Sequence, residues 1–449
     1  MFRSKFVKFA TVLFILSLIL GACGGGGTTE PAPVDDAEPD PVEPAEPAAP
    51  ESVHMTMTIW GSQLDPEVYQ KRLDRFAEQD SSNIDVEMVY IPSDYTMKVQ
   101  TMIAGGTPPC IMQLAEDIHG YSGKGQIISL NDYIEQHGVD LEARYGTTGG
   151  LVAAYTRNGD LYAMPDRGGA LILYYNKDMF DEAGLSYPTG DWTWTEFLDA
   201  AQKLTVVDGD TVEVYGFAAG GWWPWWMSFI YMNGGVVLDE SGYPAVNSRQ
   251  AVEAMEFYND LVYDYHVAPS PEDYANMGQG SPDPLFAQGL TAMSMTGFWG
   301  VGGLARVPGL NWDIAPLFMN TEPATVLFGS GLAISSDCPY PDQAFEVIEF
   351  LTSAEGQMPI VDMQQDAPAN IEVLSSDAFL NAGWAGGQTI NMQALADSAE
   401  RALPLPLSPH WNEMLTVFDD NLAEFFMNKT DAQTSMDEIQ AQLEDLFAE

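Results

Sequence analysis

Residues 55–114 read MTMTIWGSQLDPEVYQKRLDRFAEQDSSNIDVEMVYIPSDYTMKVQTMIAGGTPPCIMQL, and the spacing of apolar side chains changes along this segment. Apolar and polar residues alternate over 55–60 and again over 85–90, which predicts two strands. A short apolar run over 111–114 predicts a third strand.

Two helices are expected between these strands. Apolar residues recur at helical spacing over 66–79, and Ser93 can cap a second helix that ends at Ala104, before two glycines. The order strand–helix–strand–helix–strand is typical of a parallel sheet with right-handed crossovers. Ligands of such sheets bind beyond the carboxyl ends of the strands, so the loops after Trp60 and Leu114 are the candidate binding loops.

Helices become more frequent farther along the chain. Capping residues predict helix starts at Thr193, at Ser248 and at Ser435. A strand is expected over 291–295. The mixture of helices and strands predicts an α/β fold.

The N-terminal residues indicate export from the cytoplasm. Basic residues precede an apolar run over 9–20, which is too short to span a bilayer but suits a secretory signal. The run ends in LGAC at 20–23, which resembles a bacterial lipobox. We therefore expect a lipoprotein signal peptide over 1–22 and a lipid on Cys23 that anchors the protein outside the cytoplasm. The alternative is an ordinary signal peptide with a chance cysteine.

Residues 23–53 are expected to be the lipidated cysteine followed by a disordered tether. Positions 24–53 hold seven prolines, eight acidic residues and no basic residue. Such a segment has little apolar surface to bury and cannot offset its chain entropy by folding. No later segment is apolar enough to predict a membrane span.

Size and charge constrain the rest of the chain. Residues 54–449 exceed what one hydrophobic core usually organises, so two lobes are expected. The full sequence carries a formal net charge of −48. Nucleic acid is not expected as a partner because phosphate contacts need a basic surface. We attribute the acidity to solubility.

Cys110 and Cys338 are the cysteines that remain beyond the lipobox. They are far apart in sequence and lie at the expected ends of different strands. Two buried free thiols are expected, with a disulfide as the alternative for a protein outside the cell.

The sequence lacks the motifs of common enzyme classes. It has no glycine-rich phosphate loop, no nucleophile elbow and no His-Glu-x-x-His segment. The five histidines are scattered, and no Cys/His cluster has zinc spacing. We expect no catalytic residue, no metal and no cofactor, although 65 acidic residues leave a pair of glycosidase carboxylates open.

Aromatic residues give the positive signal. The segment GGWWPWW at 220–226 contains four of the eleven tryptophans. Sugar rings stack their C–H faces on indoles, while their hydroxyls need carboxylates, amides or arginine. Trp222 and Trp223 are therefore candidate ligand contacts. The alternative is a helix start packed into the core, which would bury only one side of the run.

Six short segments carry a family resemblance in the order of the chain. They are AGGTPP at 104–109, YYNKDMFDEAG at 174–184, WTWTEF at 192–197, NGG at 233–235, FAQG at 286–289 and GFW at 297–299. Together they closely resemble the family 1 extracellular solute-binding proteins of sugar ABC importers, maltose-binding proteins among them.

The resemblance implies a type II periplasmic-binding-protein-like fold, in which two α/β lobes close on a ligand cleft like a clamshell. It implies an N-terminal lobe of 54–168 plus about 332–382, and a C-terminal lobe of 169–331 plus about 383–449. Glycines suit the crossings between lobes because a hinge rotation is absorbed by a few backbone dihedrals. The crossings are expected near residues 168–171, 331 and 383.

The resemblance also implies most of the candidate ligand-binding residues. With the tryptophan run they are Trp60, Gln63, Asp65, Asp117, Arg167, Tyr174, Trp222, Trp223, Trp299 and Trp411. Asp117 falls where maltose-binding proteins use an acid to accept sugar hydroxyls, and Trp299 falls where the family stacks an aromatic ring. For Asp65 the alternative is helix capping, and for Arg167 it is a hinge salt bridge. Tyr174 and Tyr175 alternate along an apolar strand, so at most one points into the cleft.

The expected function is that of a non-catalytic, monomeric binding protein. It would capture a neutral mono- or oligosaccharide and deliver it to the membrane permease of an ABC importer. Basic residues are scarce in the candidate loops, which argues against a phosphorylated ligand. The alternatives are a secreted carbohydrate-active enzyme, or a binding protein for a polyamine or an oligopeptide. A polyamine would need several carboxylates near the aromatic residues, and the tryptophan run contains none.

Overall fold

In the computed structural model, the described residues are 52–448 apart from 80–82, 147–149, 210, 219, 280–281, 385–388, 404–405 and 407. The expected signal peptide, Cys23 and nearly all of the tether lie outside the described residues. A search of the described helices finds none that is long and apolar enough to cross a membrane.

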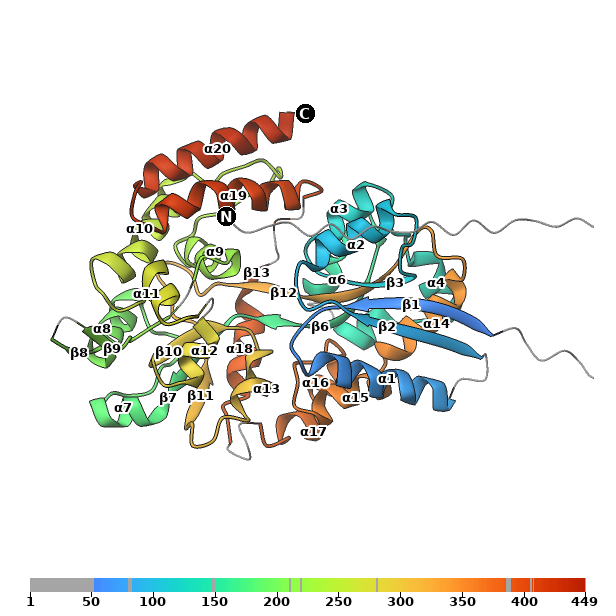
Figure 1. The fold of residues 1–449 in the computed structure, drawn as a ribbon, viewed down its shortest axis with the longest axis horizontal. Coiled ribbons are helices and arrows are strands. Elements are labelled where there is room, and N and C mark those ends of the chain that lie inside the picture. Colours follow the sequence, from blue (N-terminus) through green and yellow to red (C-terminus); the bar gives the residue numbers. More distant parts are fainter. Residues whose placement is uncertain are drawn as a thin grey trace, which may run out of the picture. The chain divides into compact units, whose positions relative to one another are not determined.

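The first sheet has the strand order β13-β12-β3-β1-β2, with β6 pairing β12. Its strands are β1 (Val53–Ile59), β2 (Ile84–Tyr90), β3 (Ile111–Leu114), β6 (Met164–Ala170), β12 (Thr325–Ile334) and β13 (Ala402–Leu403). Strand β1 is parallel to β2 and to β3, which confirms the predicted parallel arrangement. Strand β12 is antiparallel to β3 and β6. The loops after β1 and β3 therefore leave the sheet at the same edge (Figure 1).

The helices around this sheet are α1 (Asp65–Gln79), α2 (Tyr95–Ala104), α3 (Ile118–Gly123), α4 (Asn131–His137), α5 (Leu141–Tyr145), α6 (Gly150–Ala154), α14 (Pro341–Leu351), α15 (Ala354–Asp362) and α16 (Ile371–Leu374). Three side chains of α1 at helical spacing, Tyr69, Leu73 and Phe76, are buried in the core beneath it. This confirms the amphipathic pattern of the sequence. The fully buried members of this core come from 55–164 and 332–369.

The second sheet has β7 (Ile172–Asn176) between β10 (Met293–Thr296) and β11 (Trp312–Ala315), and both pairings are antiparallel. Its accompanying helices are α7 (Lys177–Ala183), α8 (Trp194–Leu204), α9 (Trp223–Met232), α10 (Arg249–Tyr263), α11 (Pro271–Asn276), α12 (Pro282–Ala287), α13 (Gly300–Leu304), α18 (Gln393–Arg401), α19 (Trp411–Phe425) and α20 (Ala432–Ala448). Helix α17 (Asp377–Leu380) packs instead against α16 of the first group. Two hairpins, β4 (Thr156–Arg157) with β5 (Asp160–Leu161) and β8 (Val206–Asp208) with β9 (Thr211–Val214), complete the described elements.

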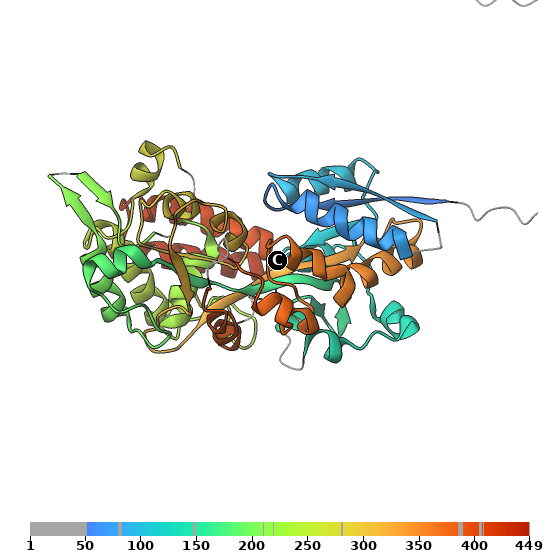
Figure 2. The same ribbon diagram turned by 90° about the horizontal axis from the view of Figure 1, so that it is seen from below.

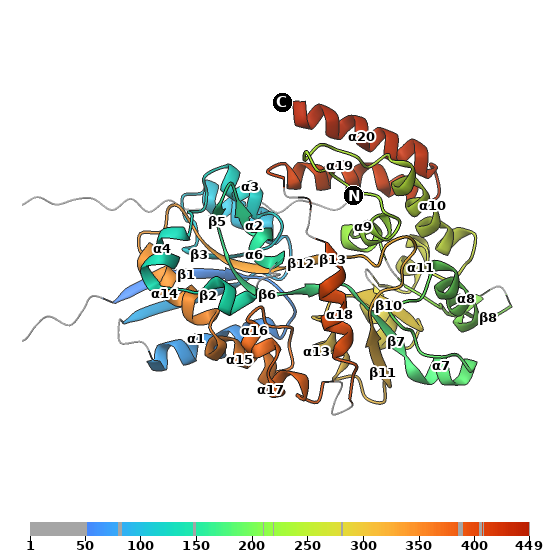
Figure 3. The same ribbon diagram turned by 180° about the vertical axis from the view of Figure 1, so that it is seen from behind.

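The first sheet with its helices and the second sheet with its helices form two groups of elements. Strands β6 and β12 link these two groups (Figure 2). The chain leaves the first sheet at Ala170 and enters the second at Ile172. Along this pair Gly168 lies opposite Gly329, and a Cβ atom on Gly329 would lie 2.3 Å from the Arg167 carbonyl oxygen. Glycine is therefore required for the close approach of the two backbones. Helix α18 packs against β6, β7 and β11 (Figure 3).

Four predicted helix starts have different outcomes. The caps at Thr193 and Ser248 are confirmed, because each hydroxyl accepts a hydrogen bond from a backbone amide three residues on. Ser93 does not cap α2, because Asp94 lies between them in a left-handed conformation with φ of 53°. Ser435 lies inside α20, and Asp431 accepts the bond from the Thr434 amide at 2.9 Å instead.

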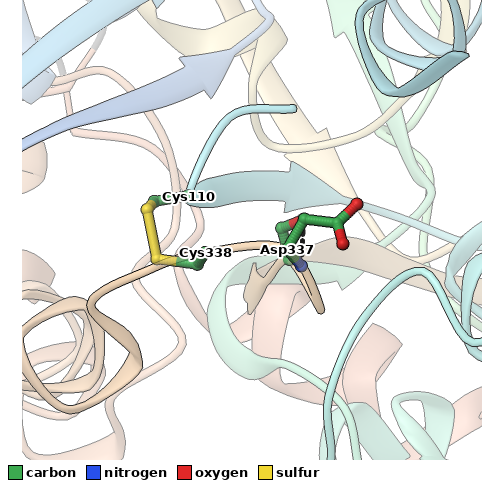
Figure 4. The surroundings of a disulfide bond; sticks show 4 residues. Cys110, Asp337 and Cys338 are labelled. Carbon is green, nitrogen blue, oxygen red and sulfur yellow. Dashed lines mark hydrogen bonds between the residues drawn. A yellow bond between two sulfur atoms is a disulfide. The ribbon is translucent and has the colours of Figure 1, made fainter. Parts of the chain in front are cut away.

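Cys110 and Cys338 form a disulfide, so the expectation of two free thiols is wrong (Figure 4). The two residues are 228 positions apart, but Ile111 of β3 pairs with Ile334 of β12. The Ser335 amide then bonds the Cys110 carbonyl oxygen, and a turn brings Cys338 back with a Cα–Cα distance of 4.6 Å. Sheet pairing between distant segments, which spacing along the sequence does not encode, sets this proximity.

Candidate ligand-binding site

A cavity of about 530 Å³ opens between the two groups of elements. Its walls come from the loops after β1 and β3, the middle of β6 and β12, the segment before α9, the segment after β10, and α19. They include Trp60, Ser62, Asp65, Tyr95, Thr96, Glu116, Asp117, Arg167, Trp222, Phe298, Trp299, Phe328, Ser330, Gln365, Asp366, Asn412 and Leu415. This volume lies within the usual range for small-molecule sites.

The loop after β1 reaches the cavity with a fixed shape. The Trp60 amide donates to Gln113 Oε1 at 3.0 Å, and the Trp60 ring lies 5.0 Å from that of Tyr95. Gly61 has φ of 138°, and a Cβ atom there would lie 2.3 Å from the carboxyl carbon of Asp65. A glycine therefore lets the loop fold tightly around the Asp65 carboxylate.

Asp65 lines the cavity, and the described hydrogen bonds of its carboxylate come from Ser62, Arg167 and Gln365 rather than from an amide of α1, so the helix-capping alternative does not hold. Its Oδ2 accepts from the Ser62 amide at 2.7 Å and from the Ser62 hydroxyl at 2.8 Å, so it organises the loop before α1. Its Oδ1 accepts from Arg167 at 2.5 Å and from the Gln365 amide at 3.2 Å. Asp65 is 1% exposed and lines the cavity with both oxygens already engaged.

Arg167 forms a salt bridge, which was the alternative to ligand contact for this residue. Besides Asp65, its NH1 lies 3.7 Å from Asp366, while its Nε atom has no hydrogen-bond partner among the described residues. Burial raises the pKa of Asp366 to about 7, although the positive charge of Arg167 acts to lower this pKa. Neighbouring Asp166 is fully buried against Arg72. Burial opposes its ionisation, yet the charge and hydrogen bond of Arg72 keep the pKa of Asp166 below its usual value.

The loop after β3 supplies two adjacent carboxylates. Asp117 accepts from the Thr96 hydroxyl at 2.9 Å and from the Ala115 amide at 3.2 Å, and burial raises its pKa. Sequence reasoning missed Glu116, which also lines the cavity. Burial and the charge of Asp117 raise the pKa of Glu116 to about 7, while a hydrogen bond with Trp223 opposes this shift. Its place directly beside Asp117 in a candidate binding loop was the signal available for it.

Besides Trp60, two more of the predicted tryptophans, Trp222 and Trp299, line the cavity. Trp222 is 42% exposed, and its ring centroid lies 6.2 Å from that of the half-buried Trp299. Trp299 also packs against Phe328 at 4.6 Å. A Cβ atom on Gly297 would lie 1.8 Å from the Trp299 ring, so the glycine allows that ring to fold back over the backbone. Indole and carboxylate groups therefore share one cavity.

Trp223 and Trp411 do not line this cavity, and their predicted ligand contact does not fit the geometry. Trp411 begins α19 as expected but is 1% exposed, and its ring packs edge-on against Trp223 at 5.1 Å. Trp225 and Trp226 are also buried in the core. The tryptophan run is thus mainly core, with Trp222 at the surface of the cavity.

Gln63 and Tyr174 line a second cavity of about 610 Å³. Gln63 is exposed on the loop after β1. Tyr174 is fully buried in β7, and its hydroxyl donates to the Gly297 carbonyl oxygen at 2.8 Å. Its ring therefore supports the wall of the second cavity, and its hydroxyl is already used by the protein. Within the described residues, no group of three or more His, Cys, Asp or Glu side chains is placed to hold a metal ion.

Comparison with known proteins gives the family. The model of the family described as bacterial extracellular solute-binding protein matches residues 57–358. A putative binding protein of Brucella abortus is 21% identical over 386 residues, which are 84% of this chain and 89% of that protein. The family match runs from β1 to α15 and so includes strands of both sheets.

Solved structures share the fold. An ABC substrate-binding protein of Listeria monocytogenes in complex with cycloalternan aligns with a TM-score of 0.80 and 26% identity, covering 89% of this chain and all of that one. Maltose-bound MalE3 of T. maritima aligns with a TM-score of 0.74 and 24% identity, covering 88% and 100%. These proteins are built from two α/β lobes, and the chain belongs to the bacterial extracellular solute-binding protein family.

Proposed function

We propose that this protein captures a saccharide outside the cytoplasm and delivers it to the permease of an ABC importer. One observation carries the proposal: Trp222 and Trp299 from one lobe share a cavity with Glu116 and Asp117 from the other. Indole faces suit the C–H surfaces of sugar rings, and carboxylates accept hydrogen bonds from sugar hydroxyls. A ligand held by both sets would draw the two lobes together.

The relatives support a carbohydrate ligand. The Listeria protein was solved with cycloalternan and the T. maritima protein with maltose, and they align over 89% and 88% of this chain. For the two lobes we propose 54–168 with about 332–382, and 169–331 with about 383–449. The confinement of one buried core to 55–164 and 332–369 supports this division.

We also propose that the protein acts as a receptor rather than an enzyme, and as a monomer tethered by a lipid on Cys23. Two of the buried carboxylates of the cavity have structural partners: Asp65 binds Arg167 and Ser62, and Asp117 binds Thr96. A glycosidase needs one carboxyl group to protonate the leaving oxygen and another for nucleophile or base. In this proposal the acids of the cavity position a sugar and do not cleave it.

A second candidate ligand is a polyamine such as spermidine. The tryptophan run contains no carboxylate, but the fold brings Glu116, Asp117 and Asp366 to the same cavity as Trp222 and Trp299. Aromatic faces and carboxylates together also suit ammonium groups. The saccharide remains the leading proposal because the relatives with bound sugars share the whole fold.

A thermal-shift screen of the mature protein separates these candidates. The panel should contain maltose and maltodextrins, cello-, xylo- and arabino-oligosaccharides, and spermidine, with calorimetric titration of each hit. We expect a raised melting temperature with one sugar series and recovery of the sugar intact after incubation. Cleavage of the sugar would support the enzyme, and a shift with spermidine alone would support the polyamine; either result would contradict the leading proposal.

A further inference from the structure

A third cavity, of about 300 Å³, lies within the second group of elements. Its described walls come from the segment before α9, from α10, from α11 with its flanking residues, and from Phe426 at the end of α19. No described residue that lines it also lines the first or the second cavity. A ligand held there would contact one lobe alone, so its binding would not require closure of the two lobes.

Three aromatic rings form the apolar part of these walls. The rings of Tyr258 on α10 and Phe426 have centroids 6.1 Å apart at an interplanar angle of 65°, and Tyr274 of α11 lines the same cavity. Pro269 and Pro271 add further apolar surface. Aromatic faces pack well on the C–H faces of small rings, so this part of the wall suits a compact cyclic molecule.

Two amide side chains form the polar part. Gln279 is half-buried, and its side chain makes no hydrogen bond with the described residues. Asn259 is 8% exposed, and its amide nitrogen donates to Asn428 Oδ1 at 3.4 Å, which is longer than the usual range for such a bond. Each amide offers donors and an acceptor, which matches a ligand that carries hydroxyl groups.

Charge and size narrow the class of ligand. Burial and the charges of Asp273 and Glu272 on α11 raise the pKa of Tyr263 on α10, so the field between these helices is negative and disfavours an anion. No described residue that lines the cavity carries a charge, so a cation would lack a carboxylate partner. The volume lies at the lower end of the usual range for small-molecule sites, which favours a single ring.

The wall of this cavity is continuous with the wall of the first. The Tyr258 hydroxyl donates to the Gly220 carbonyl oxygen at 2.7 Å, and Gly220 and Gly221 both line the third cavity. The next residue, Trp222, lines the first cavity. Glycine has more backbone freedom to lose than any other residue. A ligand that fixes this segment in one cavity would therefore lower the entropy cost of binding in the other.

We propose that the third cavity binds one neutral monosaccharide, and that this sugar strengthens ligand binding in the first cavity by fixing residues 220–222. The inference goes beyond the proposed function, because the monosaccharide would be bound within one lobe and at a different place from the captured ligand.

Ala275 offers a way to block the third cavity. It lines that cavity on α11 and is exposed, so Ala275→Trp should place an indole at the cavity. Asn276→Trp is the matched control, because Asn276 is the next residue of the same helix, is exposed and is not among the lining residues. Gln279→Ala removes one amide without adding bulk, and it serves as the second test if Ala275→Trp fails to fold.

Methyl NMR of the mature protein reports on the two cavities separately. Val262 lines the third cavity and Leu415 lines the first. The probes are glucose, galactose, mannose, xylose and arabinose. For one of them we expect a saturable shift of the Val262 methyl signals, with a dissociation constant of about 1 mM or lower, in the wild type and in Asn276→Trp. Binding should weaken at least about tenfold in Ala275→Trp, and about fivefold in Gln279→Ala with no loss of melting temperature. No saturable shift in the wild type, or equal shifts in all four proteins, would overturn the site.

The link to the first cavity has its own readouts. The Trp222 indole signal should shift with the same midpoint as Val262, although Trp222 does not line the third cavity. Calorimetric titration with the oligosaccharide identified by the thermal-shift screen should show an affinity about fivefold higher when the monosaccharide is present. Ala275→Trp should lose this gain, and it measures any direct competition by the monosaccharide in the first cavity.

The outcomes distinguish this inference from the proposed function. An unchanged Trp222 signal, or the same effect of the monosaccharide on wild type and Ala275→Trp, would overturn the link between the cavities. If Val262 and Trp222 respond to the monosaccharide but no oligosaccharide binds the wild type, the third site stands and the proposed function fails.

Discussion

Arg167 of β6 and Asp65 at the start of α1 form a buried ion pair at 2.5 Å, with side chains that are 8% and 2% exposed. The pair joins the strand that leads between the sheets to the loop that lines the first and second cavities. Removing one partner leaves the other charge buried without adequate compensation. The ion pair therefore holds the cavity wall in place at the point where the chain passes between lobes.

Substitutions at this pair should destabilise the protein in a coupled way. Arg167→Met and Asp65→Asn should each lower the free energy of unfolding by about 3 kcal/mol, and the double variant should lose less than the two together. Urea unfolding of the ligand-free protein measures all three. Arg249→Ala is the control, because Arg249 is 85% exposed in its ion pair with Glu253 and its loss should leave the free energy of unfolding nearly unchanged. Additive losses would contradict the coupling.

Trp299 and Trp411 should respond in opposite ways to truncation. Trp299 lines the first and second cavities, so Trp299→Ala should weaken sugar binding at least about thirtyfold with a modest change in melting temperature. Trp411 is 1% exposed in the core, so Trp411→Ala should cost about 3 kcal/mol or more of stability. Trp194→Ala, which removes a ring stacked on Phe257 at 4.3 Å, should also lose stability without a selective loss of affinity. Calorimetry paired with thermal melts separates tryptophans that contact the ligand from tryptophans that stabilise the core. A Trp299→Ala protein that binds sugar normally but is strongly destabilised would show that Trp299 belongs to the core.

Local patterns in the sequence were enough for the first sheet and for the loops that reach the cavity. Alternation in 55–60 and helical spacing in 66–79 indicate which faces of the strand and of the helix are buried. They were enough to predict the parallel pairing of the first strands and the place of Trp60 and Asp65 in the loop after β1. The sequence was enough to predict that Trp411 begins a helix. No local pattern indicates whether the side chains of that first turn face the cavity or the core. Its burial depends on packing against Trp223, almost 190 residues earlier in the chain.

Two of the missed features, the disulfide and the second cavity, are non-local. The disulfide needs β3 beside β12, and the second cavity needs Ser294 of β10 near Gln365 and the loop after β1. Ser294 looks like an ordinary strand residue until its hydroxyl is found to have no hydrogen-bond partner among the described residues. Sequence spacing cannot report the absence of a hydrogen bond between distant segments.

Cys23 should determine whether the protein stays on the membrane. In a bacterial host that processes lipoproteins, the wild type should fractionate with membranes, because an acylated N-terminus partitions into the bilayer. Cys23→Ser should release the protein into the soluble fraction or leave its signal peptide uncleaved. Immunoblots of the fractions with mass spectrometry of the N-terminus measure both results. A correctly cleaved Cys23→Ser protein that stays on the membrane would rule out the lipid anchor.

Loss of the disulfide should reduce stability but not affinity. The bond closes a loop of 228 residues, and its removal in Cys110→Ala with Cys338→Ala should cost about 2–5 kcal/mol. Cys110 precedes β3 whereas Glu116 follows it, so the bond lies at the end of the strand away from the cavity. Affinity should therefore stay within about twofold. A reducing agent should lower the melting temperature of the wild type only; an equal decrease in the double variant would show that the agent acts elsewhere.

Glu116 should make stability depend on pH. Burial and the charge of Asp117 raise its pKa from an ordinary value of 4.5 to about 7. Between these values the folded protein binds more protons than the unfolded chain, so the free energy of unfolding falls as pH rises through this window. Burial raises the pKa of Asp366 to about 7 as well, and this group contributes a slope of the same sign.

Glu116→Gln should remove one part of that slope. The variant keeps a side chain that can accept the Trp223 hydrogen bond, but it cannot ionise beside Asp117. It should therefore melt at a higher temperature than the wild type above pH 7 and at the same temperature near pH 4.5. Melting curves from pH 4.5 to 8 measure this difference, and the exposed Glu78→Gln on α1 should follow the wild type throughout. A Glu116→Gln protein that is less stable than the wild type at pH 8 would mean that the carboxylate is stabilised in the cavity, and that its proton is lost well below pH 7.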